Sequence, residues 1–196
     1  MSEPTAPPGA EPDRAPQAGA GCVDAGPPVV IRYADPTDAG AMLEIFNREV
    51  AQTISSWEWF ALSEADWRDW VDEHTKDDHV LLVAEAGGRV VGFAGYGTFR
   101  TKAGYVSTAE DSVFLDESFR GHGVGKRLLA RLLDEARARQ IHVMVAAITS
   151  ENLVSIGLHQ TLGFEQVGYL PQVGHKFGRW LDLVLLQITL DNRPTP

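Results

Sequence analysis

The sequence predicts a mixed α/β (α+β) domain with about seven strands and about four helices. Three observations predict this class. Short β-branched runs alternate with segments whose apolar residues recur at helical spacing. The pair Gly87-Gly88 separates two apolar runs, as in a β-hairpin, so part of the sheet is antiparallel. A glycine-rich segment, residues 119–126, stands between a strand pattern and an amphipathic helix.

The first strand and the first two helices are predicted from local signals. Residues 29–34 form a β-branched run that suits a strand. Residues 35–38, Asp-Pro-Thr-Asp, combine an N-cap, a proline at the first helical position and an acid in the first turn, so a helix is expected over residues 36–50. Ser63-Glu-Ala-Asp66 is a second capping sequence, and the helix that it begins should end near residue 74.

The later elements follow from the same signals. A helix is expected from residue 123, because the apolar residues after it recur on one face, and a second one over residues 152–162, ended by Gly163. The remaining strands are expected at residues 80–85, 90–96, 112–115, 142–149, 164–170 and 180–190. The predicted order is β-α-α-β-β-β-α-β-α-β-β.

Residues 1–28 are expected to form a disordered tail, and residues 29–192 a single folded domain. Seven of the 11 prolines lie in those first 28 residues, which show no apolar periodicity. The remainder is long enough to bury one core without disulfides or a structural metal. Because the one cysteine, Cys22, lies in the tail, an internal disulfide, a Cys-rich zinc site and a thiol acyl-enzyme are not expected.

The charge balance argues against nucleic-acid binding. The formal net charge is −10, and an acidic body cannot neutralise phosphates. The N-terminus lacks both a basic start and an apolar core of a signal peptide, and no stretch approaches the roughly 18 to 20 apolar residues of a membrane span. We therefore expect a cytoplasmic protein with neither a nucleic acid nor a membrane as partner.

The segment Arg120-Gly-His-Gly-Val-Gly-Lys126 is the first candidate for chemistry. At a helix N-terminus, backbone N–H groups and the helix dipole converge, and glycines let a diphosphate approach closely. The spacing before the lysine and the lack of Ser or Thr after it exclude a Walker A loop. The position after an antiparallel hairpin argues against a dinucleotide fingerprint. Taken alone, the segment is also compatible with a tight turn that binds nothing, although this interpretation is the less favoured of the two.

Two motifs together resemble the GNAT superfamily of acetyl-CoA-dependent N-acetyltransferases. The pattern Arg-x-x-Gly-x-Gly at residues 120–125 is similar to the pyrophosphate-binding signature of that superfamily. The pattern Asn-x-x-Ser-x-x-Leu-His-x-x-x-Gly-Phe at residues 152–164 is similar to its late helix, in which a tyrosine usually stands where this chain has His159. The two patterns occur in the expected order and on the expected elements.

The resemblance extends over residues 29–191 to the branch of phosphinothricin and methionine sulfoximine N-acetyltransferases. It rests above all on residues 108–114 (TAEDSVF), 142–146 (HVMVA) and 171–182 (PQVGHKFGRWLD). It implies a central, mixed, mostly antiparallel twisted sheet. In that sheet, the strand before the glycine loop is kinked by a bulge and splays from its neighbour. It also implies a homodimer.

The resemblance implies acetyl-CoA as the acetyl donor and no metal. The splayed strand would pair with the pantetheine arm, the glycine loop would hold the pyrophosphate, and Asn152 would bond to pantetheine. On burial tendency alone, residues 113–115 are simply a core strand. The residues implied for the cofactor are Val113, Phe114, Leu115, Arg120, Gly121, His122, Gly123, Val124, Gly125, Lys126 and Asn152.

Acetyl transfer to an amine needs a proton acceptor, because an amino-acid ammonium group has a pKa of about 8 and is mostly protonated at neutral pH. Glu110 matches the glutamate that this branch is thought to use as general base, and Asp111 is its neighbouring competitor. The backbone N–H of Val113 is expected to stabilise the oxyanion. His159, at the usual tyrosine position, is a candidate acid for the departing thiolate.

For the acceptor, the resemblance implies an α-amino group on a small amino acid or analogue, such as methionine sulfone, methionine sulfoximine or phosphinothricin. A guanidinium at Arg100 suits a carboxylate. The residues implied for the acceptor are Arg100, Thr101, Lys102, Glu110, Asp111 and Ser112. Residues 176–180, which include Lys176, Arg179 and Trp180, are expected either to close the pocket or only to connect strands.

Three further points stay open at this stage. Trp57 and Trp59 are candidates for a pocket or an interface, whereas Trp67 and Trp70, at helical spacing, suit the core. A polar turn explains residues 74–79 (His74, Asp77, Asp78 and His79) better than a metal site does. The alternatives to the proposed acceptor are a protein N-terminus, a lysine or a polyamine. A non-catalytic acyl-CoA sensor is a further alternative, although it would have no need of Glu110.

Overall fold

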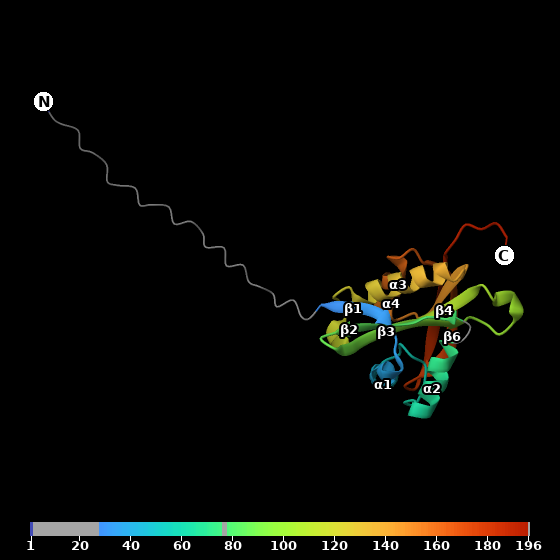
Figure 1. The fold of residues 1–196 in the computed structure, drawn as a ribbon, viewed down its shortest axis with the longest axis horizontal. Coiled ribbons are helices and arrows are strands. Elements are labelled where there is room, and N and C mark those ends of the chain that lie inside the picture. The colour runs from blue at the N-terminus through green and yellow to red at the C-terminus, as the bar shows by residue number, and fades with distance from the viewer. Residues whose placement is uncertain (2–27, 76–77, 196) are drawn as a thin grey trace.

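The computed structural model describes Met1, residues 28–75 and residues 78–195 of the 196-residue chain. The expected tail therefore lies almost wholly outside the described residues, as does Asp77. Seven strands and four α-helices follow one another in the predicted order (Figure 1). They are β1 (Val29–Tyr33), α1 (Ala39–Gln52), α2 (Glu64–Glu73), β2 (Leu81–Ala86), β3 (Arg89–Thr98), β4 (Thr108–Leu115), α3 (Val124–Ala138), β5 (Val143–Thr149), α4 (Leu153–Gln160), β6 (Glu165–Lys176) and β7 (Arg179–Thr189).

All seven strands form one sheet in the order β1-β2-β3-β4-β5-β7-β6. Neighbouring strands are antiparallel except β4 and β5, which run parallel. The mixed, mostly antiparallel sheet that was predicted is therefore confirmed.

Two helices cover each face of the sheet. Figure 1 shows α1 and α2 on one side, and α3 and α4 on the other. Strand side chains alternate between the faces, so Phe93 and Phe114 pack with the α1 and α2 residues, whereas Ala94 and Val113 pack with α3. The sheet thus separates two apolar cores, and neighbouring residues of β4 face different surroundings.

The capping signals in the sequence are used as predicted. The Asp35 side chain accepts a hydrogen bond from Thr37 N, and the Asp38 side chain in turn accepts one from the backbone N–H of Asp35. Ser63 and Asp66 form the same reciprocal box at the start of α2. These bonds satisfy N–H groups that a helix start leaves without intrahelical partners. α2 begins where the sequence indicates, whereas Asp35 caps a short 3₁₀ turn, Pro36–Asp38, and α1 itself begins at Ala39, three residues after the predicted start.

Two strands extend at least four residues beyond their predicted bounds. β4 begins at Thr108, four residues before the predicted start, because its first residues pair with both β3 and β5. β6 continues past Pro171 to Lys176, although a proline ordinarily ends a strand. Pro171 is tolerated there since it falls within a register shift on the edge strand of the sheet, where no ladder hydrogen bond is required of it.

The predicted bulge in the strand before the glycine loop is not found in its pairing with β3. The seven residue pairs from Gly92↔Leu115 to Thr98↔Ala109 follow one another without a register shift. Within this sheet, register shifts occur instead between β2 and β3, at Ala84 and Glu85, and between β6 and β7. The separation of β4 from β5 therefore does not depend on a bulge toward β3.

Candidate active site

β4 and β5 separate partway along their length and open a fork in the sheet. They pair only at Thr108↔Val143, Ala109↔Met144 and Glu110↔Val145. Beyond this point β4 stays paired with β3, and β5 stays paired with β7. Residues 111–115 of β4 consequently have no strand partner on the β5 side. An extended ligand could take that place through backbone hydrogen bonds.

A glycine turn connects the open end of β4 to α3. Gly121 and Gly123 both have φ near +76°, and Gly123 is the N-cap of α3. Only glycine adopts this conformation without strain. No heavy atom lies within 4 Å of where a Cβ would stand at either position. The turn is therefore open to a ligand at the positive end of the α3 dipole.

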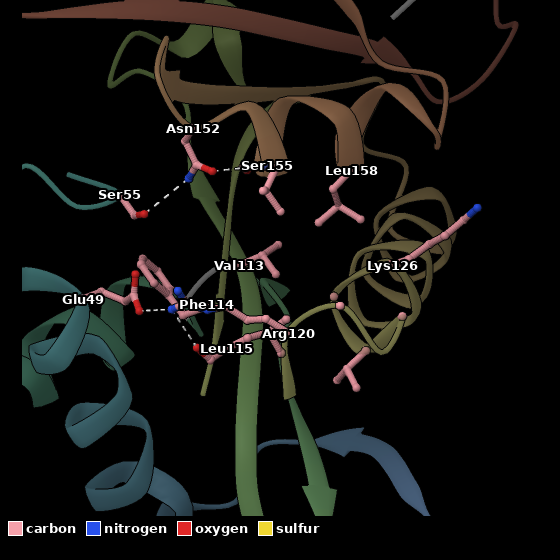
Figure 2. Close-up of a pocket in the computed structure, with 15 residues that line it drawn as sticks. Glu49, Ser55, Val113, Phe114, Leu115, Arg120, Lys126, Asn152, Ser155 and Leu158 are labelled. Atoms are coloured by element: carbon pink, nitrogen blue, oxygen red, sulfur yellow. Dashed lines mark hydrogen bonds and ion pairs between the residues drawn. The ribbon is translucent and has the colours of Figure 1, made fainter. Parts of the chain in front are cut away.

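A cavity of about 340 Å³ joins the fork to this turn (Figure 2). The predicted cofactor residues lie on its wall, with one exception: His122 is exposed and its Nδ1 lies 2.8 Å from the carbonyl oxygen of Arg120. The remaining wall comes from α1, the α1–α2 connection and α4. The lining residues are Glu49, Ser55, Val113, Phe114, Leu115, Arg120, Gly121, Gly123, Val124, Gly125, Lys126, Asn152, Val154, Ser155 and Leu158.

Arg120 lines the cavity, but its guanidinium is directed toward α1. It forms an ion pair with the buried carboxylate of Glu49 and donates to the carbonyl oxygen of Leu115. Figure 2 shows Glu49 and Arg120 meeting beside the end of β4. In this arrangement the Arg120 side chain ties α1 to β4, and the backbone of the glycine turn is what faces a ligand.

Asn152 borders the cavity from the other side. Its Oδ1 accepts from Ser155 N at 3.1 Å and so caps α4, whereas its Nδ2 donates to Ser55 Oγ at 3.3 Å. The amide therefore links α4 to the segment between α1 and α2 at the mouth of the fork.

Glu110 lies at the last paired position of the fork. Its cross-strand neighbour is Gly97, where an added Cβ would face the ring of His74 at the end of α2, so Glu110 points to the α1–α2 face. The carboxyl is half-buried. Burial and the negative charge of Asp111 raise its pKa, and the positive charge of Arg100 opposes them in part. A carboxyl in such surroundings is a stronger base than an exposed one.

Asp111 lies on the opposite face from Glu110. Its side chain is 1% exposed, and Oδ2 is 2.9 Å from His159 Nε2 of α4. His159 Nδ1 lies 2.7 Å from the carbonyl oxygen of Ser155. The structure thus joins a predicted acceptor residue to the predicted acid as a buried pair, beside a smaller cavity of about 80 Å³ at the fork.

The other predicted acceptor residues lie around the end of β3 and the start of β4. Arg100, Thr101 and Lys102 are exposed in the segment that follows β3, and the Arg100 guanidinium lies 5.0 Å from the centroid of the Phe99 ring. Ser112 lines the 80 Å³ cavity. Arg100 and Glu110 are close enough for the arginine charge to affect the pKa of the carboxyl.

The segment between α1 and α2 is held against β6. Lys176 is buried, and its Nζ donates to the carbonyl oxygen of Ser56 at 2.6 Å. Burial lowers the pKa of Lys176, while the charges of nearby Glu58 and Glu49 oppose this. Trp59 Nε1 donates to the carbonyl oxygen of His175 at 3.2 Å. Lys176 therefore anchors this segment, and it does not line either cavity at the fork.

Trp67 and Trp70 belong to the core, as the sequence indicated. Trp67 is buried, and it stacks on Trp70 between α1 and β3. Trp57 packs against Gly174 of β6, where a Cβ would stand 2.3 Å from its ring. Trp180 is exposed, and its neighbour Arg179 forms an ion pair with Glu151 at 2.6 Å. Among the described residues, no group of three or more His, Cys, Asp or Glu side chains is arranged to hold a metal ion.

The chain matches the family model described as "Acetyltransferase (GNAT) family" over residues 42–164, more than half of its length. The chain belongs to the GNAT acetyltransferase family. It is therefore an acetyltransferase. In the part of the chain that the structure describes, no helix is long and apolar enough to cross a membrane.

Within this family, the chain is similar to N-acetyltransferases of amino-acid analogues. The L-methionine sulfoximine/L-methionine sulfone acetyltransferase of Pseudomonas aeruginosa is 45% identical over 162 residues, which are 82% of this chain and 94% of the relative. The phosphinothricin N-acetyltransferase of Alcaligenes faecalis is 33% identical, with 82% of each chain covered. A solved acetyltransferase from Salmonella typhimurium, described with its cofactor acetyl-CoA, is 41% identical. Its TM-score is 0.83, over 86% of this chain and 97% of that one.

Five residues on the wall of the 340 Å³ cavity were not among those predicted for the cofactor from the sequence of this acetyltransferase. Ser155 and Leu158 belong to the late-helix pattern, so the pattern itself could have identified them. Glu49 carries a different signal: it is an acid on the buried face of an amphipathic helix, where a partner is required. The five residues are Glu49, Ser55, Val154, Ser155 and Leu158.

Proposed function

We propose that this acetyltransferase moves the acetyl group of acetyl-CoA to the α-amino group of a small amino acid or analogue of the methionine sulfone, methionine sulfoximine or phosphinothricin type. Glu110 acts as general base. The observation that carries the proposal is the placement of Glu110, a half-buried carboxyl with a raised pKa, at the point where β4 leaves β5, on the strand whose residues 113–115 line the 340 Å³ cavity. The names of the relatives support the acceptor class.

The residues present fit acetyl-CoA. The glycine turn offers backbone N–H groups and the α3 dipole to a diphosphate, and no heavy atom near Gly121 or Gly123 blocks its approach. The open side of β4 at residues 113–115 suits the amide-bearing pantetheine arm. When bound, acetyl-CoA supplies a thioester that an amine can attack. The Salmonella typhimurium relative was solved with this molecule.

Glu110 would take the proton that the ammonium group must lose before it can attack. Its raised pKa brings its basicity closer to the working pH, and its side chain faces the α1–α2 side of the sheet. The backbone N–H of Val113 would stabilise the developing oxyanion. Arg100 would pair with the acceptor carboxylate, and Thr101, Lys102 and Ser112 would complete that side.

The acceptor is tested by a panel assay. CoA release is followed with a thiol reagent on methionine sulfone, methionine sulfoximine, phosphinothricin, ordinary amino acids, polyamines and peptides, and the mass of each product is measured. We expect N-acetyl products from the first three compounds. Turnover confined to polyamines, lysine side chains or peptide N-termini would replace the proposed acceptor. Binding of acetyl-CoA without turnover on any amine would indicate a sensor.

Replacing Gly123 by alanine is expected to raise the Kd for acetyl-CoA at least about tenfold, because the new Cβ stands where the diphosphate approaches. Gly88 is a matched control: it has φ of +78° and equally open surroundings, but it lies in the β2–β3 turn, away from the cavity. Both variants should lose about 1 kcal/mol of stability from the left-handed backbone. Calorimetric titration separates them, and equal Kd values for the two variants would contradict the cofactor site.

We also propose a homodimer and a cytoplasmic location, since acetyl-CoA is an intracellular metabolite. β6 forms one edge of the sheet and carries the exposed apolar residues Val167, Tyr169 and Val173. A second copy would cover this edge. Light scattering should give twice the chain mass, and the double variant V167K/V173K should give the mass of one chain. A wild type that is monomeric at micromolar concentration would contradict the dimer.

A further inference from the structure

The heavy-atom contacts of the buried pair Asp111–His159 bear on where its protons lie. Both ring nitrogens of His159 face oxygen atoms: Nδ1 faces the Ser155 carbonyl at 2.7 Å, and Nε2 faces Asp111 Oδ2 at 2.9 Å. A carbonyl oxygen only accepts, so Nδ1 carries a proton. A second proton must then lie between Nε2 and Oδ2, because two acceptors in contact would repel each other.

Among the groups described around His159, Asp111 is the one that carries a charge. From its own helix, His159 meets the carbonyl oxygen and, at 3.5 Å, the hydroxyl of Ser155. The ring of Phe164 packs edge-on against it at 4.9 Å. β5 contributes the uncharged residues 146–148 to the same cavity. Burial lowers the pKa of His159, but the hydrogen bond and charge of Asp111, with the Ser155 carbonyl, raise it more, so that the net shift is upward.

The pair also borders the smaller cavity at the fork. Asp111 Oδ1 is buried without a hydrogen-bond partner, and Asp111, Ser155 and His159 line the 80 Å³ cavity, which is large enough for water. Ser155 lines the 340 Å³ cavity as well. Ser155, whose hydroxyl lies 3.5 Å from His159 Nδ1, thus belongs to the walls of both cavities.

We propose that Asp111 is a positioning residue: it fixes a proton on His159 Nε2, so that the proton on Nδ1 is the one released through the Ser155 hydroxyl to the sulfur that leaves. The inference rests on the proposed function of the fork. After release, the imidazole is neutral with its remaining proton on Nε2, still bonded to Asp111. The sulfur has gained one proton, and solvent restores the proton to Nδ1. Asp111 thus selects the tautomer, as the aspartate of a serine-protease triad does.

The protonation state is measured first, by nitrogen NMR of the histidine side chains in the full chain without acetyl-CoA or acceptor. We expect His159 to carry protons on both nitrogens at pH 7 and to lose one only at higher pH than an unperturbed histidine. In D111N this loss should move to lower pH, since the carboxylate charge is gone. One unprotonated nitrogen on wild-type His159 at pH 7 would overturn the proposal, whatever the acceptor is.

The kinetic arm uses D111N, S155A and a matched control. D191N removes the carboxylate of a second Asp–His contact, His142–Asp191 at 2.7 Å, which lies outside both cavities. We expect D111N and S155A to lower kcat roughly ten- to a hundredfold, with the KM for acetyl-CoA within about twofold, and D191N to change neither. The alkaline limb of the kcat profile should move to lower pH in D111N.

The experiments on the Asp111–His159 pair can fail or succeed independently of the proposed acetyl transfer. If no amine is acetylated, the NMR arm still tests the pair. If D111N fails to fold by circular dichroism, the wild-type NMR titration and S155A remain. An unchanged kcat in S155A, or an unchanged alkaline limb in folded D111N, would overturn the proton path.

Discussion

Replacing Glu110 by glutamine is expected to lower kcat/KM for the amine by about 10²- to 10⁴-fold, the usual contribution of a general base. The amide keeps the size and one acceptor oxygen of the side chain but cannot take a proton. Because Glu110 is not among the residues that line the 340 Å³ cavity, the Kd for acetyl-CoA should stay within about twofold. Fixed-time product assays measure kcat/KM, and calorimetric titration measures the Kd for acetyl-CoA.

The matched control for that variant is E165Q, at an exposed glutamate at the start of β6, and it should leave both quantities unchanged. The pH profile gives a second check. The base works only when ionised, and burial and Asp111 raise its pKa. Activity should therefore fall, as pH decreases, at a higher pH than that of an ordinary glutamate. Equal loss of turnover and acetyl-CoA binding in E110Q would show that Glu110 is structural.

Replacing Trp67 by alanine is expected to destabilise the fold by about 3 to 5 kcal/mol, the range for large aromatic residues in cores. Its side chain is 1% exposed, it stacks on Trp70 with ring centroids 4.5 Å apart, and it contacts Phe46 and Phe93. The cavity left behind would separate α2 from α1 and β3. Urea unfolding measures the change.

The control for the core variant is F60A, because Phe60 is 79% exposed. That substitution should change stability by less than about 0.5 kcal/mol. A loss below about 1 kcal/mol in W67A would mean that α2 does not depend on this cluster, and would contradict the described packing.

Local signals were sufficient to predict most of the fold. The capping boxes, the Gly87-Gly88 turn and the glycine-rich segment each act within a few residues, so the sequence indicated the positions of helices and hairpins. The end of β6 could not be predicted in this way. Pro171 is tolerated only because β6 is the edge strand with a register shift, and both facts depend on which strands pair.

The site was predicted less completely, because side-chain direction depends on distant partners. Alternation along β4 could have shown that Glu110 and Asp111 face opposite sides. Nothing local, however, indicated that Asp111 would meet His159, 48 positions away. Similarly, Arg120 was expected at the pyrophosphate, whereas its guanidinium pairs with Glu49 of α1. The buried Lys176 was also not identifiable as an anchor for Ser56.

Direct transfer of the acetyl group from acetyl-CoA to the amine is the central claim, and a two-step mixing experiment tests it. The enzyme is mixed with acetyl-CoA alone, and released CoA and the intact protein mass are measured; methionine sulfoximine is then added. We predict no CoA release and an unchanged protein mass before the amine is added, and one N-acetyl product per CoA afterwards. A burst of CoA equal to the enzyme concentration, with an acetyl group on the protein, would contradict the account.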